Sequence, residues 1–303
     1  YYLFTIDKEN GAFGGCACIC YSIVDMNLNG GLGNITSKNI LLHTQTTEKM
    51  AVVKHQNDTS YLVVAHDYGS NNYLSYLIDT NGINPVPILN PIGTSICCAL
   101  NSINSVGQLK ISPDCQKVGT SILSDGKVEL FNFNTSTGQM SNPISIPMPY
   151  NDVYGFEFSP DSKNVYTTCW TLQDSRLFQM DISSWDSTTI NSSLTEIYHS
   201  NTATYGQLQL GPDNKIYCSN RFEFTINIIN NPTTLGWQCD FQRDMFQLSN
   251  TLGYGRCIAG LPNRISYCRN NTEINSDTNC DITIPNVITP NNDSINDVFS
   301  ITC

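Results

Sequence analysis

An all-β fold is predicted by a threefold internal repeat and by the lack of any helical periodicity sustained over three turns. Each repeat alternates apolar and polar residues, turns at Pro-Asp and then begins a second alternating strand. The copies start at Gly107, Gly155 and Gly206, and their prolines stand at positions 113, 160 and 212. A period of roughly 40–55 residues with several short strands is typical of β-propeller blades. The sequence therefore predicts a propeller of four-stranded antiparallel blades.

The rest of the chain follows the same pattern. Residues 1–7 predict a strand, and residues 61–66 and 73–78 predict a hairpin in an early blade. Residues 127–133 and 176–181 occupy the third-strand position of their blades. We expect a propeller over residues 1–268, with about five blades visible and a ring of six or seven when completed, followed by an extended tail over 269–303. A parallel β-helix is the main alternative, but its repeats are shorter. The blades are expected to start near residues 1, 50, 105, 153 and 205.

Composition excludes several classes of function. The chain carries 15 Lys and Arg against 26 Asp and Glu, a net charge of −11, and its basic residues are scattered singly. Nucleic-acid binding needs a clustered basic surface, so we expect no nucleic-acid partner. No run of about 18 apolar residues occurs, so we expect no membrane insertion. The chain has no initiator Met, and its first residues predict a strand rather than a signal peptide, which indicates a mature or processed fragment.

Thirteen cysteines favour an oxidising compartment. Cys16, Cys18 and Cys20 would face one side of a strand, which suits cross-strand disulfides, whereas the paired C-x(2–4)-C knuckles of a zinc site are absent. We therefore expect mostly disulfides, this triplet included, rather than a metal. Because thirteen is odd, at least one thiol is free or bonds another chain, and Cys303 is the candidate for the second case. Cys268 and Cys280 are expected to be bonded near the start of the tail. The disulfide candidates are Cys16, Cys18, Cys20, Cys97, Cys98, Cys115, Cys169, Cys218, Cys239, Cys257, Cys268, Cys280 and Cys303.

The sequence contains no recognisable catalytic motif: no G-x-S-x-G elbow, H-E-x-x-H, Walker loop or G-x-G-x-x-G turn. His55, His66 and Asp67 lie near strand ends of one blade. They are candidates for ligand binding in a central funnel. The alternative is that they are hydrogen-bonded strand-end residues, as most lone histidines are.

Two further sets of residues have both a functional and a structural explanation. Clustered oxygen atoms in the tail could hold calcium, the one cofactor considered, although a plain Asx turn needs no ion. The calcium candidates are Asn292, Asp293, Asn296 and Asp297. The three tryptophans could stack on sugars in a surface groove or pack between blades. They are Trp170, Trp185 and Trp237.

Residues 285–299 meet every defined position of the pattern P-N-x-x-T-P-N-x-D-x-x-N-D-x-F. The segment resembles the opening of the gliding-motility-associated C-terminal domain, the type B sorting signal of type IX secretion in Bacteroidota. The resemblance implies export to the cell surface. In relatives this domain continues well past the position of Phe299.

Other segments resemble the propellers that precede this sorting domain in Bacteroidota surface proteins, with lactonase- or WD40-like blades. In such relatives about a blade and a half precedes the strand that matches residues 1–7, and cysteine is far rarer. The matching segments are 21–33, 53–55, 65–71, 205–217, 228–232 and 260–263.

Glycosylation is the expected modification of a protein of this class. Six Asn-x-Ser/Thr sequons occur, and two sites fit the D-[ST]-[AILMTV] pattern known from Bacteroidota. The candidates are Asn34, Asn57, Asn134, Asn191, Asn270, Asn292, Ser187 and Ser294.

We expect a non-catalytic, secreted propeller that serves adhesion or extracellular assembly. Its expected partners are copies of itself or surface glycans and proteins. Residues 282–303 carry strand-like segments that could add to the sheet edge of a neighbouring copy and build a filament. A lactonase-like hydrolase and a carbohydrate-binding module are the alternatives.

Overall fold

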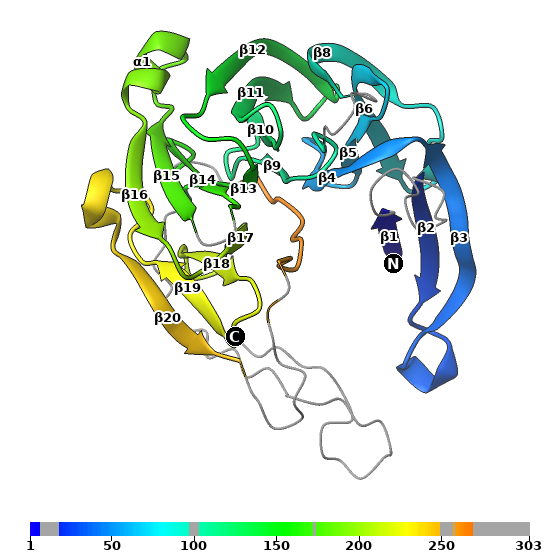
Figure 1. Ribbon diagram of the computed structural model, residues 1–303. Coiled ribbons are helices and arrows are strands. Elements are labelled where there is room, and N and C mark those ends of the chain that lie inside the picture. The colour runs from blue at the N-terminus through cyan, green and yellow to red at the C-terminus, as the bar shows by residue number, and fades with distance from the viewer. Residues whose placement is uncertain (7–17, 97–102, 172–173, 249–256, 258, 269–303) are drawn as a thin grey trace. The chain divides into compact units, whose positions relative to one another are not determined.

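A computed structural model describes residues 1–6, 18–96, 103–171, 174–248, 257 and 259–268. All of them lie in the first of the two units into which the chain divides, Tyr1–Arg269. The described strands form five sheets that follow one another in chain order (Figure 1), and every strand pair within a sheet is antiparallel. The predicted all-β propeller is confirmed.

The five sheets are called blades 1 to 5. Blade 1 contains β1 (Tyr2–Ile6), β2 (Cys18–Asp25) and β3 (Asn34–Thr44), with the 3-10 turn η2 (Asn29–Gly31) before β3. Blade 2 contains β4 (Thr46–Lys54), β5 (Tyr61–Asp67), β6 (Ser70–Asp79), β7 (Gly82–Ile83) and β8 (Ile88–Ile96). Blade 3 contains β9 (Leu109–Ile111), β10 (Lys117–Ile122), β11 (Lys127–Asn134) and β12 (Gln139–Pro147). Blade 4 contains β13 (Val153–Phe158), β14 (Asn164–Cys169), β15 (Ser175–Asp181), the helix α1 (Ser187–Ser192) and β16 (Thr195–Ser200). Blade 5 contains β17 (Tyr205–Leu210), β18 (Ile216–Asn220), β19 (Thr225–Ile229), the 3-10 turn η3 (Gly236–Cys239) and β20 (Phe241–Gln247).

Blades 3, 4 and 5 have the predicted four strands, and their starts agree with the expected positions. The described part of blade 1 has only three strands. Blade 2 has five, because β6 pairs with the short β7 over its last residues and with β8 over the rest. The expectation of four strands is therefore wrong for blade 2, whereas in blade 1 residues 7–17, between β1 and β2, lie outside the described residues.

The repeat prolines stand at equivalent turns, as predicted. Each lies between the first and second strands of its blade, at β9–β10, β13–β14 and β17–β18. In each turn a residue two positions after the proline adopts a left-handed conformation: Cys115 (φ 58°), Ser162 (φ 60°) and Asn214 (φ 62°). The residue before the proline closes the turn by donating its N–H to a carbonyl at or just before the start of the second strand. Proline presets φ for such a turn, which explains why the motif recurs in blades 3, 4 and 5.

Apolar side chains pack between neighbouring blades. Val128, Leu130 and Phe156 belong to one buried cluster that joins blades 3 and 4. Gly119 on β10 leaves room for this packing, because a Cβ atom there would overlap the Phe156 ring. Close packing of this kind fixes the rotation between blades and so positions their first strands.

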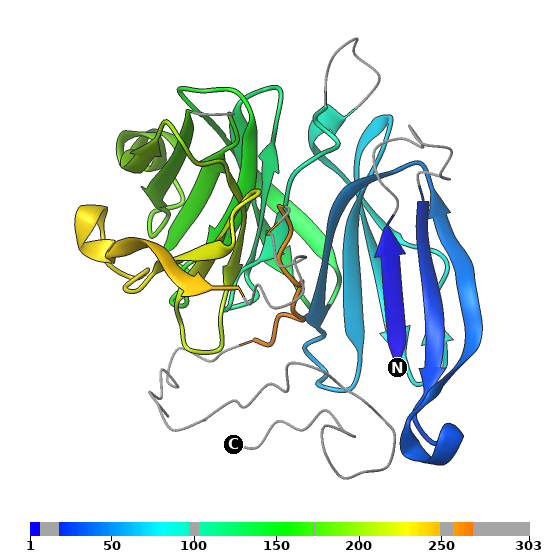
Figure 2. The same cartoon turned by 60° about the horizontal axis from the view of Figure 1, so that its bottom comes forward.

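The first strands β4, β9, β13 and β17 lie next to one another, each contacting its neighbour. Residues 259–268, named here the return segment, run along these strands (orange in Figures 1 and 2). Gln207 N–H donates to the Ala259 carbonyl at 2.9 Å, and Ser266 N–H donates to the Val52 carbonyl at 2.8 Å. A disulfide joins Cys268 to Cys115. The return segment is thus held against blades 5, 2 and 3.

Candidate functional site

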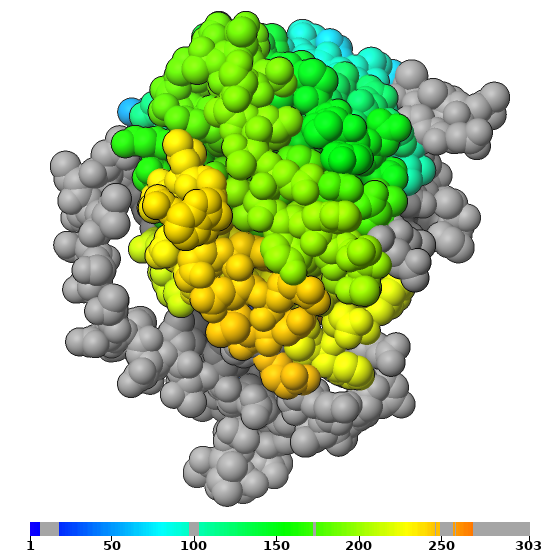
Figure 3. Space-filling model, turned by 60° about the vertical axis from the view of Figure 1, so that its left-hand side comes forward, coloured from blue at the N-terminus to red at the C-terminus, as the bar shows by residue number. Residues whose placement is uncertain are grey.

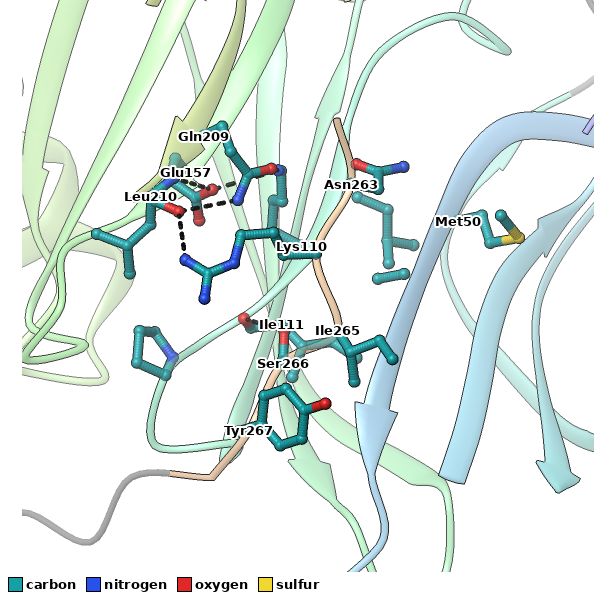
Figure 4. Close-up of a pocket in the computed structure, with 14 residues that line it drawn as sticks. Met50, Lys110, Ile111, Glu157, Gln209, Leu210, Asn263, Ile265, Ser266 and Tyr267 are labelled. Atoms are coloured by element: carbon teal, nitrogen blue, oxygen red, sulfur yellow. Dashed lines mark hydrogen bonds and ion pairs between the residues drawn. The ribbon is translucent and has the colours of Figure 1, made fainter. Parts of the chain in front are cut away.

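Three polar side chains converge where the first strands of blades 3, 4 and 5 meet. Lys110 on β9, Glu157 on β13 and Gln209 on β17 each stand three residues before a repeat proline. Lys110 Nζ lies 3.2 Å from Glu157 Oε2 and donates to Gln209 Oε1 at 2.7 Å (Figure 4). Lys110 is 7% exposed and Glu157 4%. An ion pair so shielded is screened only weakly by salt.

The Glu157 carboxylate is fixed by the backbone as well as by Lys110. Phe158 N–H donates to Oε1 at 2.9 Å, and Leu210 N–H donates to Oε2 at 2.9 Å. Hydrogen bonds to a charged acceptor are the stronger ones, so the carboxylate is held in one orientation. Because both carboxylate oxygens already accept hydrogen bonds, Glu157 is better suited to be a fixed negative charge than a freely available base.

Gln108, two residues before Lys110, links the same three blades through hydrogen bonds of its side chain. Phe156 N–H and Leu208 N–H both donate to Gln108 Oε1 at 2.9 Å, and Gln108 Nε2 donates to the Leu208 carbonyl at 3.1 Å. This side chain is buried, so losing it would leave backbone groups unpaired. The hydrogen bonds make the region around Lys110 rigid.

A cavity of about 90 Å³ lies beside Lys110. The first strands of the blades form one side, and the return segment forms the other (Figure 4). Arg264 is exposed at the rim and donates from Nη1 to the Leu210 carbonyl at 3.5 Å, and Tyr267 beside it is 54% exposed. The cavity, named here the axial pocket, thus brings two cations and one carboxylate between walls that are partly apolar and partly polar. The apolar part of these walls is formed by Met50, Ala51, Leu109, Ile111, Pro113, Leu210 and Ile265.

A further buried lysine lies outside the axial pocket, between blades 2 and 3. Lys49 on β4 is 0% exposed, and its Nζ donates to the Val106 carbonyl at 2.7 Å. Burial lowers the pKa of Lys49 from its ordinary value of 10.5 to about 7, against the opposing influence of Glu48 and Glu129. Gly107 is needed here, because it has a φ of +131° and a Cβ atom would lie 3.0 Å from Lys49 Nζ.

The predicted funnel residues do not line the axial pocket. His55 Nε2 donates to the Ser136 carbonyl at 3.1 Å, and Asp67 Oδ1 lies 3.0 Å from His43 Nε2. His66 is buried, and its Nδ1 lies 2.7 Å from the Asp67 carbonyl. Burial, together with the charge of Lys49, lowers the pKa of His66 to about 4. The structure therefore supports the alternative, in which all three are hydrogen-bonded residues of blade 2.

Among the cysteines that the structure describes, fewer are bonded than predicted. Cys268 is bonded as expected, to Cys115, with Cα atoms 5.1 Å apart, and Cys18 is also in a disulfide. The expectation is wrong for five others, which are free: Cys20, Cys169, Cys218, Cys239 and Cys257. The last four are buried, and burial raises the pKa of Cys169 and of Cys218 to about 12. They act as small apolar side chains of the core. Cys16, Cys97, Cys98, Cys280 and Cys303 lie outside the described residues.

The tryptophans differ from one another. Trp170 packs edge-on against Tyr154 with ring centroids 4.2 Å apart, and Trp185 Nε1 donates to the Asn142 carbonyl of blade 3 at 3.1 Å. Packing between structural elements is thus correct for these two. Trp237 is 82% exposed.

The described glycosylation candidates are accessible, and they stand as predictions. Asn34, Asn57, Asn134, Asn191 and Ser187 are all exposed. Asn270, Asn292 and Ser294 lie outside the described residues, as do the calcium candidates in the tail.

Within the described ranges, no group of three or more His, Cys, Asp or Glu side chains is arranged to hold a metal ion. No helix in that same part of the chain is long and apolar enough to cross a membrane.

Sequence reasoning did not identify Lys110, Glu157 and Gln209 as a group. A signal for them exists: the position three residues before the repeat proline is polar in all three copies, although it lies in a strand whose neighbours are apolar. Equivalent positions of successive blades face the same axis, so polar residues there are expected to meet. Lys49 has no comparable signal, because its blade lacks the Pro-Asp turn.

No protein-family model matches the sequence, and no curated protein matches it. Solved structures do match. A putative 6-phosphogluconolactonase from Bacteroides uniformis superposes with a TM-score of 0.51 at 13% identity, over 75% of this chain and 64% of its own. Another from Bacteroides fragilis gives 0.50 at 12% identity, over 80% and 66%. The periplasmic gluconolactonase of Pseudomonas aeruginosa gives 0.50 at 11% identity, over 80% and 68%.

At such identities the likeness establishes the fold alone. The chain spans 64% to 68% of the length of these three proteins. Their propeller architecture agrees with the five blades described above. Activity and substrate are not carried over by this comparison.

Proposed function

We propose that this chain is a ligand-binding β-propeller, and that the carboxylate of a sugar acid occupies the axial pocket. One observation carries the proposal: Lys110, Glu157 and Gln209, at equivalent positions of three blades, converge on a cavity whose rim carries Arg264. The lactonase names of the structural neighbours support sugar acids and their lactones as the ligand class.

The size and charge of the pocket favour a carboxylate head group. A volume of about 90 Å³ is small beside the roughly 300–1,000 Å³ of pockets that enclose whole drug-sized ligands. A carboxylate fits, with the polyol chain extending past the exposed rim. Lys110 is neutralised by Glu157, so Arg264 supplies the net positive charge. Gln209 can donate or accept toward a hydroxyl group.

Lactone hydrolysis is a second candidate, supported by the same neighbours. Opening a lactone requires a base that activates water and a donor that stabilises the developing oxyanion. Glu157 is the carboxylate at the pocket and Arg264 the donor. Because both Glu157 oxygens accept backbone N–H groups, we favour binding without turnover.

Sodium gluconate titrated into the protein tests the proposal by calorimetry. We expect saturable binding that weakens about 2- to 5-fold in Arg264→Gln, the range for an exposed charged contact worth up to about 1 kcal/mol. Lys163→Gln removes the same charge from an exposed position on the β13–β14 turn and should leave the affinity unchanged. Absence of binding at millimolar gluconate would refute the proposal. Gluconolactone opening above the uncatalysed rate, abolished in Glu157→Gln, would favour the hydrolase instead.

We also propose that the protein is exported to the cell surface, because residues 285–299 match the type IX sorting pattern at every defined position. Filament assembly rests on a different argument, the strand-like segments of residues 282–303 that could add to the sheet edge of a neighbouring copy. Mild protease treatment of intact cells of the source organism, followed by mass spectrometry, is expected to release peptides of this chain. Their recovery only after lysis would contradict surface display.

A further inference from the structure

The loop between β19 and β20 presents two apolar side chains to solvent. Trp237 is 82% exposed and Leu235 is 53% exposed. The short turn η3 projects from the outer edge of blade 5 just before β20 (gold in Figures 1 and 3). Exposing an indole ring to water is unfavourable, so this arrangement needs an explanation other than folding.

Three buried side chains of blade 4 hold this loop. Asn164 Nδ2 and Tyr166 OH both donate to the Pro232 carbonyl, at 3.2 and 3.0 Å. Gln179 Nε2 donates to the Thr234 carbonyl at 2.6 Å, and Gly236 N–H donates to Gln179 Oε1 at 2.7 Å. The three side chains are at most 3% exposed. The backbone before Leu235 and between Leu235 and Trp237 is therefore fixed before any ligand arrives, which reduces the entropic cost of binding.

The chemistry around Trp237 narrows the choice of ligand. Residues 230–239 include no charged side chain, and the exposed polar groups are amides and hydroxyls, among them Asn231, Thr233 and Gln238. A membrane surface is normally met by basic residues, which are absent here. A stable protein partner needs roughly 800 Å² per side, more than a single loop offers. A ring-shaped, uncharged ligand that is apolar on its face and hydroxylated at its rim matches the loop.

We propose that the Trp237 loop binds carbohydrate, with the indole ring stacked on a pyranose face. The C–H groups of a β-linked glucose unit lie on its two faces and its hydroxyls point outward from the ring edge. An aromatic ring covers such a face, and neighbouring amide and hydroxyl groups pair with the hydroxyls. The site lies on the outer edge of blade 5, apart from the axial pocket.

Cellohexaose, a β-1,4-linked glucose hexamer, is the probe. Native protein is expected to bind it, with a change in tryptophan fluorescence. In Trp237→Ala the affinity measured by calorimetry should fall about 2- to 13-fold, the equivalent of the 0.5–1.5 kcal/mol typical of aromatic stacking. Trp237→Tyr should retain part of the affinity. Leu89→Ala removes another exposed apolar side chain from a different blade and should have no effect.

Failure of the native protein to bind cellohexaose overturns the proposal, as does equal binding by Trp237→Ala. Loss of binding by Trp237→Ala would not be caused by misfolding, because a side chain that is 82% exposed contributes little to stability. Unchanged thermal unfolding of the variant checks this. Gluconate binding by Trp237→Ala should equal that of the native protein, so the two sites are tested separately.

Discussion

Replacing Cys115 by serine is expected to lower the free energy of unfolding by about 3–5 kcal/mol. The disulfide to Cys268 joins residues 153 apart in sequence, so its loss restores a large amount of chain entropy to the unfolded state. It also frees the return segment, which near Cys268 keeps the hydrogen bonds of Ser266 with Val52, Lys54 and Ile111. Urea unfolding of non-reduced protein gives the measurement.

Three companion variants show whether the effect of Cys115→Ser comes from loss of the disulfide. Cys268→Ser and the double variant should be as unstable as Cys115→Ser, because each removes the same bond. Cys20→Ser, at a free and partly exposed cysteine, should change stability by less than about 0.5 kcal/mol. Equal stability of Cys115→Ser and Cys20→Ser would show that the bond does not hold the return segment.

Between pH 7.5 and 9 the native protein is expected to gain about 2 kcal/mol of stability relative to Lys49→Met. The folded chain holds Lys49 uncharged above a pKa of about 7, whereas the unfolded chain keeps it protonated up to about 10.5. The unfolded state therefore binds the extra proton throughout this window, and raising the pH stabilises the folded state. Below pH 7 the effect levels off, because the amine is charged in both states.

Denaturant unfolding of both proteins at pH 7.5, 8.25 and 9 measures this difference. Other titrating groups are common to both proteins and cancel. The lost hydrogen bond to the Val106 carbonyl adds an offset that does not change with pH. Parallel stability curves for the two proteins would contradict a buried, uncharged Lys49. Lys163→Met, at an exposed lysine, is the matched control and should run parallel to the native curve.

The sequence predicts the propeller because its Pro-Asp turns are local features. The residues around Pro113, Pro160 and Pro212 specify a turn without help from distant parts of the chain, so the repeat could be found by its spacing. The fifth strand of blade 2 could not be predicted, because that blade lacks this turn. Pairing of β6 with β7 and β8 depends on which edge is free after folding.

The site was harder to predict than the fold. Lys110 and Glu157 are 47 residues apart in sequence, and only the rotation between blades brings them to 3.2 Å. The free cysteines were misassigned for a similar reason: thirteen thiols indicate a compartment, but burial of Cys169 or Cys218 in an apolar core is set by packing. The return segment has two sequence signals, Cys268 and the resemblance of residues 260–263, and neither predicts that it runs along the first strands.

The central claim is that the axial pocket binds a carboxylate between the blades and the return segment. A crystal structure of the protein soaked in sodium gluconate tests it directly. The claim predicts density for the carboxylate in the pocket beside Lys110, within hydrogen-bond distance of Arg264 or Gln209. Gluconate bound elsewhere, or a pocket filled by side chains of the return segment, would contradict it.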